Sequence, residues 1–357
     1  MTDFGFREWP FATVPTIDRG VSVWADRTKA KTQVDEIFED WGFQPQSTIT
    51  LMWADLGAGK THTLYYLKGR CDKEGGLVPF YVLLPAAVTD FVSLYRMIAR
   101  SFDWGLVTPG LSANPATEMA ANLGQTMKWR ATSIDTRRRQ LAQQWLQADR
   151  LTASQCQIIG VSSPIRTADD AVEVLRAAIQ GITEGGARVV LMIDEYQRVA
   201  EGRRRQLHEI GHAIHTLYNA CPLRLSLVLS CATGGFDDYT MVLTPEIVSR
   251  LSPKRVQLHY LSSSDALEYV HDLFAAYRDQ ASKVDPFYPL TETSAQEFAQ
   301  YLIARLTGEL TPRRLNMAYS ELLGDIRAGR TSAPCSTEAL KEWLDRKGPD
   351  LVDALAS

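Results

Sequence analysis

Short apolar segments alternate with longer amphipathic ones over roughly the first 260 residues of the chain. Five of the short segments are apolar on both faces, as is typical of interior strands in a parallel sheet. They are Thr48–Ala54, Val78–Leu84, Arg188–Asp194, Leu223–Ser230 and Lys254–Leu261. Apolar spacing of the helical kind predicts helices near 26–41, 61–70, 87–103, 167–183 and 198–220. This alternation predicts an α/β fold with a parallel five-stranded sheet and crossover helices.

The strand pattern stops near residue 262, and the remaining chain is periodic in the helical sense. Helices are predicted near 263–282, 293–306, 312–327 and 336–346. We therefore expect two domains, an α/β domain over 1–261 and a helical domain over 262–357. The chain from Thr61 to Asp194 is longer than one strand and two helices require. Its excess, at about 104–166, is expected to be a mostly helical insertion.

Composition narrows the class of protein without naming a function. The chain has 357 residues, 45% of them hydrophobic, and a formal net charge of −4, so binding to nucleic acid would need local basic patches. Its five cysteines are scattered and form no C-x-x-C pair, which favours buried thiols in a reducing compartment. No segment approaches the roughly 18 apolar residues of a membrane helix. These features predict a cytoplasmic protein that does not contact a membrane.

A phosphate-binding loop is predicted where the first strand ends. The strand Thr48–Ala54 runs into Asp55-Leu56-Gly57-Ala58-Gly59-Lys60-Thr61, and a helix follows. Glycines let the backbone curl so that its N–H groups face phosphate oxygens, and the helix N-terminus adds partial positive charge. Ala54 stands where the motif usually has its first glycine, which is a mild departure. The predicted nucleotide-binding residues are Gly57, Ala58, Gly59, Lys60, Thr61 and His62.

The third strand predicts the other half of a nucleotide site. Five apolar residues, Val189 to Ile193, lead directly into Asp194 and Glu195. A buried strand of this kind delivers carboxylates to the carboxyl edge of an open α/β sheet, where ligands bind. Asp194 and the Thr61 hydroxyl are the predicted Mg²⁺ ligands, with Asp194 acting through water. Glu195 is the predicted general base that polarises the attacking water.

Together these two motifs resemble those of the AAA+ ATPases, and most of all their ORC/Cdc6-like branch. The N-terminal Phe4-Gly5-Phe6, Pro10-Phe11 and Pro15 resemble the opening of ExeA- and TniB-like ATPases. The segment Trp24-Ala25-Asp26-Arg27 is similar to the box that precedes the phosphate loop in this branch. The resemblance implies a P-loop NTPase of the AAA+ type with a C-terminal helical lid, ATP and Mg²⁺ as ligands, ATP hydrolysis, and assembly into a homo-oligomer.

The AAA+ resemblance also implies roles for three further residues. Thr233, at the end of the fourth strand, aligns with the sensor 1 position that orients the attacking water, with Ser230 as the second choice. Arg250 lies in a segment similar to the one that carries the arginine finger, which acts on a neighbouring subunit. Arg313 follows Pro312 in a segment that resembles the sensor 2 motif. The alternative for each is an ordinary capping or solvated side chain.

A narrower likeness concerns the segments Trp145-Leu146, Gly160-Val161 and Ala168-Asp169-Asp170-Ala171. They resemble parts of the ATP-binding proteins of BREX-type phage-defence systems. This likeness implies a partner protein of the same system and a role in defence against phage.

His208-Glu209-Ile210-Gly211-His212 matches the zinc motif H-E-x-x-H, with His215 one turn further along. On a helix, positions 208, 212 and 215 share a face that could hold a metal, and Glu209 would then serve as a base. Gly211 weakens such a helix, and no further ligand motif follows. We expect surface or core histidines rather than a zinc enzyme.

Basic triplets at Arg137-Arg138-Arg139 and Arg203-Arg204-Arg205 are the candidate DNA contacts, with solvated faces or subunit contacts as the alternative. Two functional hypotheses remain open. In the first, an oligomeric ATPase remodels or loads onto DNA or a partner protein, in phage defence or mobile-element biology. In the second, ATP binding operates a switch or scaffold on a protein partner, and hydrolysis is slow.

Overall fold

The computed structural model describes residues 4–11, 28–85, 88–102, 133–161, 163–202, 204–232, 239–279 and 282–356. Two compact units emerge from the contacts within the chain. The first, which we call the helical unit, comprises Met1–Val34, Ala54–Tyr66 and Gln257–Ser357. The second, which we call the sheet unit, comprises Asp35–Trp53 and Leu67–Val256. The phosphate loop therefore groups with the C-terminal helices, although its strand belongs to the sheet.

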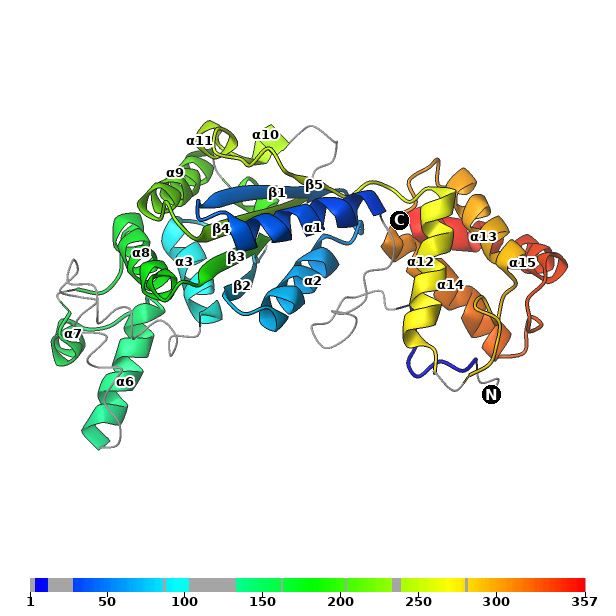
Figure 1. Ribbon diagram of the computed structural model, residues 1–357, viewed down its shortest axis with the longest axis horizontal. Helices are drawn as coiled ribbons and strands as arrows, with labels where there is room; N and C mark the ends of the chain where they lie inside the picture. The colour runs from blue at the N-terminus through cyan, green and yellow to red at the C-terminus, as the bar shows by residue number, and fades with distance from the viewer. Residues whose placement is uncertain are drawn as a thin grey trace. The chain divides into compact units, whose positions relative to one another are not determined.

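The predicted five-stranded parallel sheet is present, with the strand order β2-β3-β4-β1-β5 (Figure 1). The strands are β1 (Thr48–Ala54), β2 (Leu77–Leu83), β3 (Arg188–Asp194), β4 (Leu225–Ala232) and β5 (Val256–Gln257). Every residue of β3 is buried, as expected for a central strand covered on both faces. Its register pairs Asp194 with Leu83 on β2 and Ile193 with Leu229 on β4.

The fifth strand is much shorter than predicted. The apolar pattern predicted a strand over Lys254–Leu261, but only Val256 and Gln257 pair in the sheet. An edge strand has one neighbour only, so little backbone pairing holds its ends. Leu261 instead belongs to the core of the helical unit, where its N–H donates to the Leu310 carbonyl at 2.8 Å. The side chain of Leu261 is therefore apolar because it is buried in the core of the helical unit. The strand prediction was wrong beyond Gln257.

Helices occur along this part of the chain largely where the periodicity predicted them (Figure 1). They are α1 (Thr28–Phe43), α2 (Lys60–Lys73), α3 (Phe91–Ser101), α6 (Ser133–Leu146), α7 (Ala153–Ile159), α8 (Ala168–Glu184), η1 (Tyr196–Val199), α9 (Arg204–Ala220), α10 (Tyr239–Val242) and α11 (Pro245–Val248). Helices α3, α8 and α9 pack against one another. Their apolar faces form one continuous core with strands β1 to β4.

The expected insertion at 104–166 is described only from residue 133 onward, and there it contains α6 and α7. These two helices pack against each other and contribute Trp145 and Leu146 to the core of the sheet unit. The buried Tyr95 hydroxyl on α3 donates to the Leu146 carbonyl, and the Trp145 indole donates to the Ser163 carbonyl at 2.8 Å. The C-terminal end of α6 and helix α7 are therefore packed into the core of this unit.

The C-terminal region is helical as predicted. It contains α12 (Ser263–Tyr277), α13 (Glu292–Arg305), α14 (Pro312–Arg327) and α15 (Thr337–Ala356). The last helix continues ten residues beyond the predicted end at 346. Pro349 lies inside this helix and does not end it. Capping boxes begin α12 and α13, at Ser262 and Thr291.

The N-terminal segment is part of the helical unit. Phe4 and Phe11 are buried in the core formed by α12 to α15. Arg278, 9% exposed, donates to the backbone carbonyls of Phe4 at 3.4 Å and Tyr288 at 2.8 Å. A buried guanidinium needs such acceptors, so these bonds hold the N-terminal segment to the helices. The predicted box Trp24-Ala25-Asp26-Arg27 lies outside the described residues.

All five cysteines are buried and reduced. Burial raises the pKa of Cys71 and of Cys221 to about 12 and that of Cys335 to about 11, which keeps these thiols protonated near neutral pH. Within the described part of the chain, no helix is both long and apolar enough to cross a membrane.

Candidate nucleotide site

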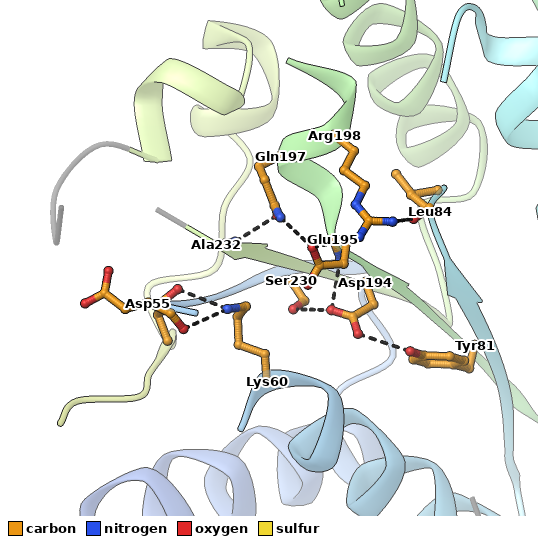
Figure 2. Close-up of polar contacts among 11 residues, drawn as sticks. Asp55, Lys60, Tyr81, Leu84, Asp194, Glu195, Gln197, Arg198, Ser230 and Ala232 are labelled. Carbon is orange, nitrogen blue, oxygen red and sulfur yellow. Dashed lines mark hydrogen bonds and ion pairs between the residues drawn. The ribbon is translucent and has the colours of Figure 1, made fainter. Parts of the chain in front are cut away.

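The phosphate loop has the backbone that its glycines predict. Gly57 and Gly59 have φ angles of 78° and 96°, in the left-handed region that favours glycine. Lys60 begins α2 and is only 5% exposed. Its ammonium donates to the carbonyls of Ala54 at 3.1 Å and Asp55 at 3.0 Å (Figure 2). The lysine side chain therefore folds back over the loop, and the predicted residues from Gly57 to His62 form one continuous loop and helix start.

The N-terminus of α14 lies directly against this loop. The Arg313 N–H donates to the Gly57 carbonyl at 3.4 Å. A Cβ added at Gly57 would come within 3.2 Å of both the Arg313 Cβ and the Thr311 hydroxyl, so a larger residue would crowd both and would need a strained left-handed backbone. Thr311 caps α14 by accepting from the Arg314 N–H at 3.3 Å. The residue expected to act as sensor 2 thus lies beside the phosphate loop.

A second contact joins the loop to the chain that precedes α12. A hydrogen bond to the Asp55 carboxylate raises the pKa of Tyr260 to about 12. Within the helical unit, the phosphate loop is therefore held to the start of α14 by its backbone at Gly57 and to Tyr260 by the side chain of Asp55. Sequence reasoning did not single out Tyr260, because only the folded chain brings it to Asp55.

The carboxylate that ends β3 is buried and anchored on three sides (Figure 2). Asp194 is 0% exposed. It accepts from the Tyr81 hydroxyl of β2 at 3.1 Å, the Ser230 hydroxyl of β4 at 2.8 Å and the Glu195 N–H at 2.9 Å. A buried carboxylate requires such donors. They fix its direction, which suits a metal ligand that acts through water.

Glu195 follows Asp194 in a left-handed conformation, with φ 58° and ψ 37°. This backbone is uncommon for a non-glycine residue and turns the chain from β3 into η1. The Glu195 carboxylate accepts from the Gln197 amide at 2.7 Å and pairs with the Arg198 guanidinium at 3.5 Å (Figure 2). Glu195 is therefore directed by residues of the following turn.

The structure describes only one of the two candidates for the sensor 1 residue. Thr233, the first choice, lies outside the described residues. Ser230, the second choice, is buried and bonds Asp194, so it supports the metal ligand. Tyr81 and Gln197 were missed by sequence reasoning. Tyr81 could have been found from the predicted sheet, because it lies near the carboxyl end of a strand that neighbours β3.

Arg250 lies in the turn that follows α11. Its side chain is exposed, and its N–H donates to the Ile247 carbonyl at 2.9 Å. Its guanidinium makes no hydrogen bond or ion pair with any residue that the structure describes. An arginine in this setting is able to reach another molecule.

The H-E-x-x-H segment lies on α9. His208, Glu209 and His212 are exposed, and His215 is half-buried. Within the described ranges, no group of three or more His, Cys, Asp or Glu side chains could hold a metal. Gly211 has a packing role, because a Cβ there would come within 2.4 Å of the Thr244 methyl group.

The basic triplets are described in part. Arg137 on α6 and Arg204 and Arg205 at the start of α9 are exposed. Arg203 lies outside the described residues, as do the side chains of Arg138 and Arg139.

The phosphate loop and the acid pair each follow a strand of the same sheet. Strand β4 lies between β1, which leads into the loop, and β3, which ends in Asp194. Comparison with solved structures identifies the same architecture in nucleotide-binding proteins. The ORC2 protein of Aeropyrum pernix, solved as ADPNP–ADP complexes, matches with a TM-score of 0.55 at 11% identity, over 91% of this chain and 70% of that one. The fold is that of the P-loop AAA+ ATPases.

Two further structures share this AAA+ fold. The Walker-type ATPase of Pyrococcus abyssi matches with a TM-score of 0.50 at 14% identity, over 97% of this chain and 78% of that one. The Aeropyrum pernix ORC1 protein, solved in complex with DNA, matches with a TM-score of 0.50 at 14% identity, over 96% of this chain and 70% of that one. No protein-family model matches the sequence, and no curated protein matches it. The predicted resemblance to ORC/Cdc6-like AAA+ ATPases is confirmed for the fold.

Proposed function

We propose that this protein is an ATPase that binds ATP with Mg²⁺ and uses its hydrolysis, as a homo-oligomer, to load onto or remodel DNA or a partner protein. One observation carries the proposal. A phosphate loop with two left-handed glycines and a folded-back lysine follows one strand of a parallel sheet, and an anchored Asp194 beside Glu195 ends another strand of that sheet. Ligands of open α/β sheets bind at the carboxyl ends of strands.

The phosphate loop and Arg313 would bind the nucleotide. The loop from Gly57 to His62 would hold the phosphates with its backbone N–H groups, and Lys60 would exchange its carbonyl partners for phosphate oxygens. Such an exchange needs little rearrangement, because a lysine ammonium is a compact donor on a flexible stem. Arg313, beside Gly57, would contact the nucleotide from the helical unit.

The donor set suits Mg²⁺. Thr61 offers a hydroxyl and Asp194 a carboxylate, the hard oxygen ligands that this ion prefers. Bound Mg²⁺ would neutralise charge on the phosphates. Because the donors of Asp194 come from β2, β4 and the backbone of Glu195, its carboxylate would keep its direction as the nucleotide changes.

Glu195 would accept a proton from the attacking water. Thr233 would orient that water, and Arg250 would act on the nucleotide of a neighbouring subunit. The exposure of Arg250, and the absence of a described partner for its guanidinium, support a role outside its own subunit.

DNA is the first candidate for the client. The exposed arginines Arg137, Arg204 and Arg205 offer phosphate contacts, and one protein that shares the fold was solved in complex with DNA. The likeness to ExeA-, TniB- and BREX-type proteins points to a role in phage defence or mobile-element biology, with a protein partner of the same system.

Steady-state ATPase rates with and without duplex and single-stranded DNA test this proposal. We expect hydrolysis by the wild-type protein that increases with DNA. Lys60→Ala should abolish binding of a fluorescent ATP analogue, because the variant loses its phosphate-contacting ammonium. Glu195→Gln should bind ATP and retain it unhydrolysed.

The outcomes separate the candidates. Hydrolysis that no nucleic acid stimulates or binds would shift the client to a protein. Tight ATP binding with negligible turnover would favour the nucleotide-gated switch or scaffold. A wild-type protein that binds no nucleotide would refute both.

A further inference from the structure

The side chain of Gln197 makes two hydrogen bonds that use its two ends differently. Its amide nitrogen donates to the Glu195 carboxylate at 2.7 Å, and its amide oxygen accepts from the Ala232 N–H at 2.8 Å (Figure 2). The orientation of the amide follows from its partners, because a flipped group would place a donor against the Ala232 N–H. Gln197 therefore joins Glu195 to the last residue of β4.

The second partner of Glu195 is attached elsewhere. Arg198 lies 3.5 Å from the Glu195 carboxylate and donates to the Leu84 carbonyl, just beyond the end of β2. The Arg198 side chain is 30% exposed, so water weakens this ion pair. The shorter bond from Gln197 is therefore the more directional of the two constraints on Glu195.

The backbone explains why a constraint is needed. Glu195 has left-handed φ and ψ angles and lies between the fully buried strand β3 and the start of η1. Asp194 is directed by three donors, but the only described side chains that direct Glu195 are those of Gln197 and Arg198. A base that is misplaced by about 1 Å can lose about a hundredfold in rate.

We propose that Gln197 is a positioning residue that aims the Glu195 carboxylate and ties its position to the end of β4. This inference rests on the proposed ATPase function. The bridge would thereby tie the base to the strand that neighbours β3 in the sheet. Gln197 itself contacts no reacting atom in this role.

Substitution of Gln197 by methionine tests the proposal, because methionine has a similar length and volume but makes neither bond. Gln197→Met should lower kcat roughly 10- to 100-fold. KM and the affinity for a fluorescent ATP analogue should stay within about twofold of wild type, because the phosphate loop is untouched. Gln180→Met is the matched control, since Gln180 is also half-buried and also hydrogen-bonded, but to Arg176 on α8.

A double-mutant cycle with Glu195→Gln separates positioning from a general effect on structure. If Gln197 acts through Glu195, Gln197→Met should cause no further loss of single-turnover hydrolysis in the Glu195→Gln background. Gln197→Glu provides a second readout. It keeps an acceptor for the Ala232 N–H but places a carboxylate against Glu195, so it should be at least as slow as Gln197→Met. Thermal unfolding of each variant verifies that the fold is retained.

Three results would overturn the inference. One is a kcat of Gln197→Met equal to that of wild type. Another is an equal fractional loss in both backgrounds of the cycle. The third is recovery of wild-type activity by Gln197→Glu, which would assign the effect to β4 alone. A wild-type protein without ATPase activity would refute the proposed function and this inference together. If the wild-type protein is active but the effects of Gln197→Met and Glu195→Gln on hydrolysis are additive, only this inference is refuted.

Discussion

At the scale of single residues, two adjacent arginines at the start of α14 have different surroundings. Arg314 donates to the Glu309 carbonyl at 2.7 Å and lies 3.6 Å from the Glu309 carboxylate, so its guanidinium is occupied within the loop that precedes the helix. Arg313 is exposed, and its backbone lies against Gly57 of the phosphate loop. Of the two arginines, Arg313 is therefore the one that we expect to contact the nucleotide.

Truncation of each arginine should separate these roles. We expect Arg313→Ala to weaken ATP binding or turnover about tenfold, equivalent to about 1.4 kcal/mol, because a cation beside the phosphates is lost. Arg314→Ala should stay within about twofold of wild type, because its ion pair with Glu309 is solvent-exposed. Titration with a fluorescent ATP analogue and steady-state ATPase rates measure both effects. Equal losses in the two variants would contradict the assignment.

At the scale of elements, α9 shows why a glycine that is unfavourable for a helix is present. Gly211 is buried where α9 packs against the segment leading into α11. Thr244 lies so close that a Cβ on residue 211 would come within 2.4 Å of its methyl group and 2.6 Å of its hydroxyl. The glycine thus permits close approach of two elements, and its presence within H-E-x-x-H follows from packing.

Alanine substitution at two helical glycines should have opposite effects. Gly211→Ala should destabilise the protein by about 1–3 kcal/mol, because overpacking against Thr244 outweighs the better helix propensity of alanine. Gly324→Ala in α14 is the control, because its Cβ would meet no atom within 4 Å. That variant should gain about 0.5–1 kcal/mol. Urea denaturation followed by circular dichroism measures both, and a stabilised Gly211→Ala would contradict this account of the packing.

At the scale of the whole molecule, the site is expected to be completed by another subunit. The described chain directs Asp194 and Glu195 internally, whereas Arg250 is exposed and its guanidinium has no partner among the described residues. An arginine finger supplied by a neighbour increases hydrolysis by several orders of magnitude in P-loop GTPases. This arrangement would make activity depend on assembly.

Mixing two inactive variants tests that dependence. The Lys60→Ala protein is expected to lose nucleotide binding but retains Arg250, and the Arg250→Ala protein is expected to bind nucleotide but to supply no finger. Their mixture should recover part of the wild-type ATPase rate, with a maximum at an intermediate ratio. Lys60→Ala mixed with Glu195→Gln is the control and should recover nothing, because no subunit in it has both a nucleotide and its own base. Absence of recovery at every ratio would exclude a role for Arg250 in trans.

Much of the fold followed from local patterns. The limits of β1 and β3 were predicted to the residue, because each strand is apolar on both faces and is bounded by a change in polarity. Helix α14 was also predicted to the residue, since Thr311 and Pro312 mark its start. The prediction failed at β5, where apolar residues beyond Gln257 fill the core of the other unit. The hydrophobicity of a segment indicates that it is buried, but it does not indicate in which of the two cores.

The sequence by itself determined the fold class and identified the residues of the candidate site: the loop from Gly57 to Thr61, and the acid pair Asp194 and Glu195. These are contiguous motifs whose spacing encodes local geometry. Only the tertiary structure decided which side chains direct the acid pair. Tyr81 and Gln197 reach the acids from β2 and η1. Such contacts depend on strand order and on the path of a single turn, which no periodicity in a linear chain records.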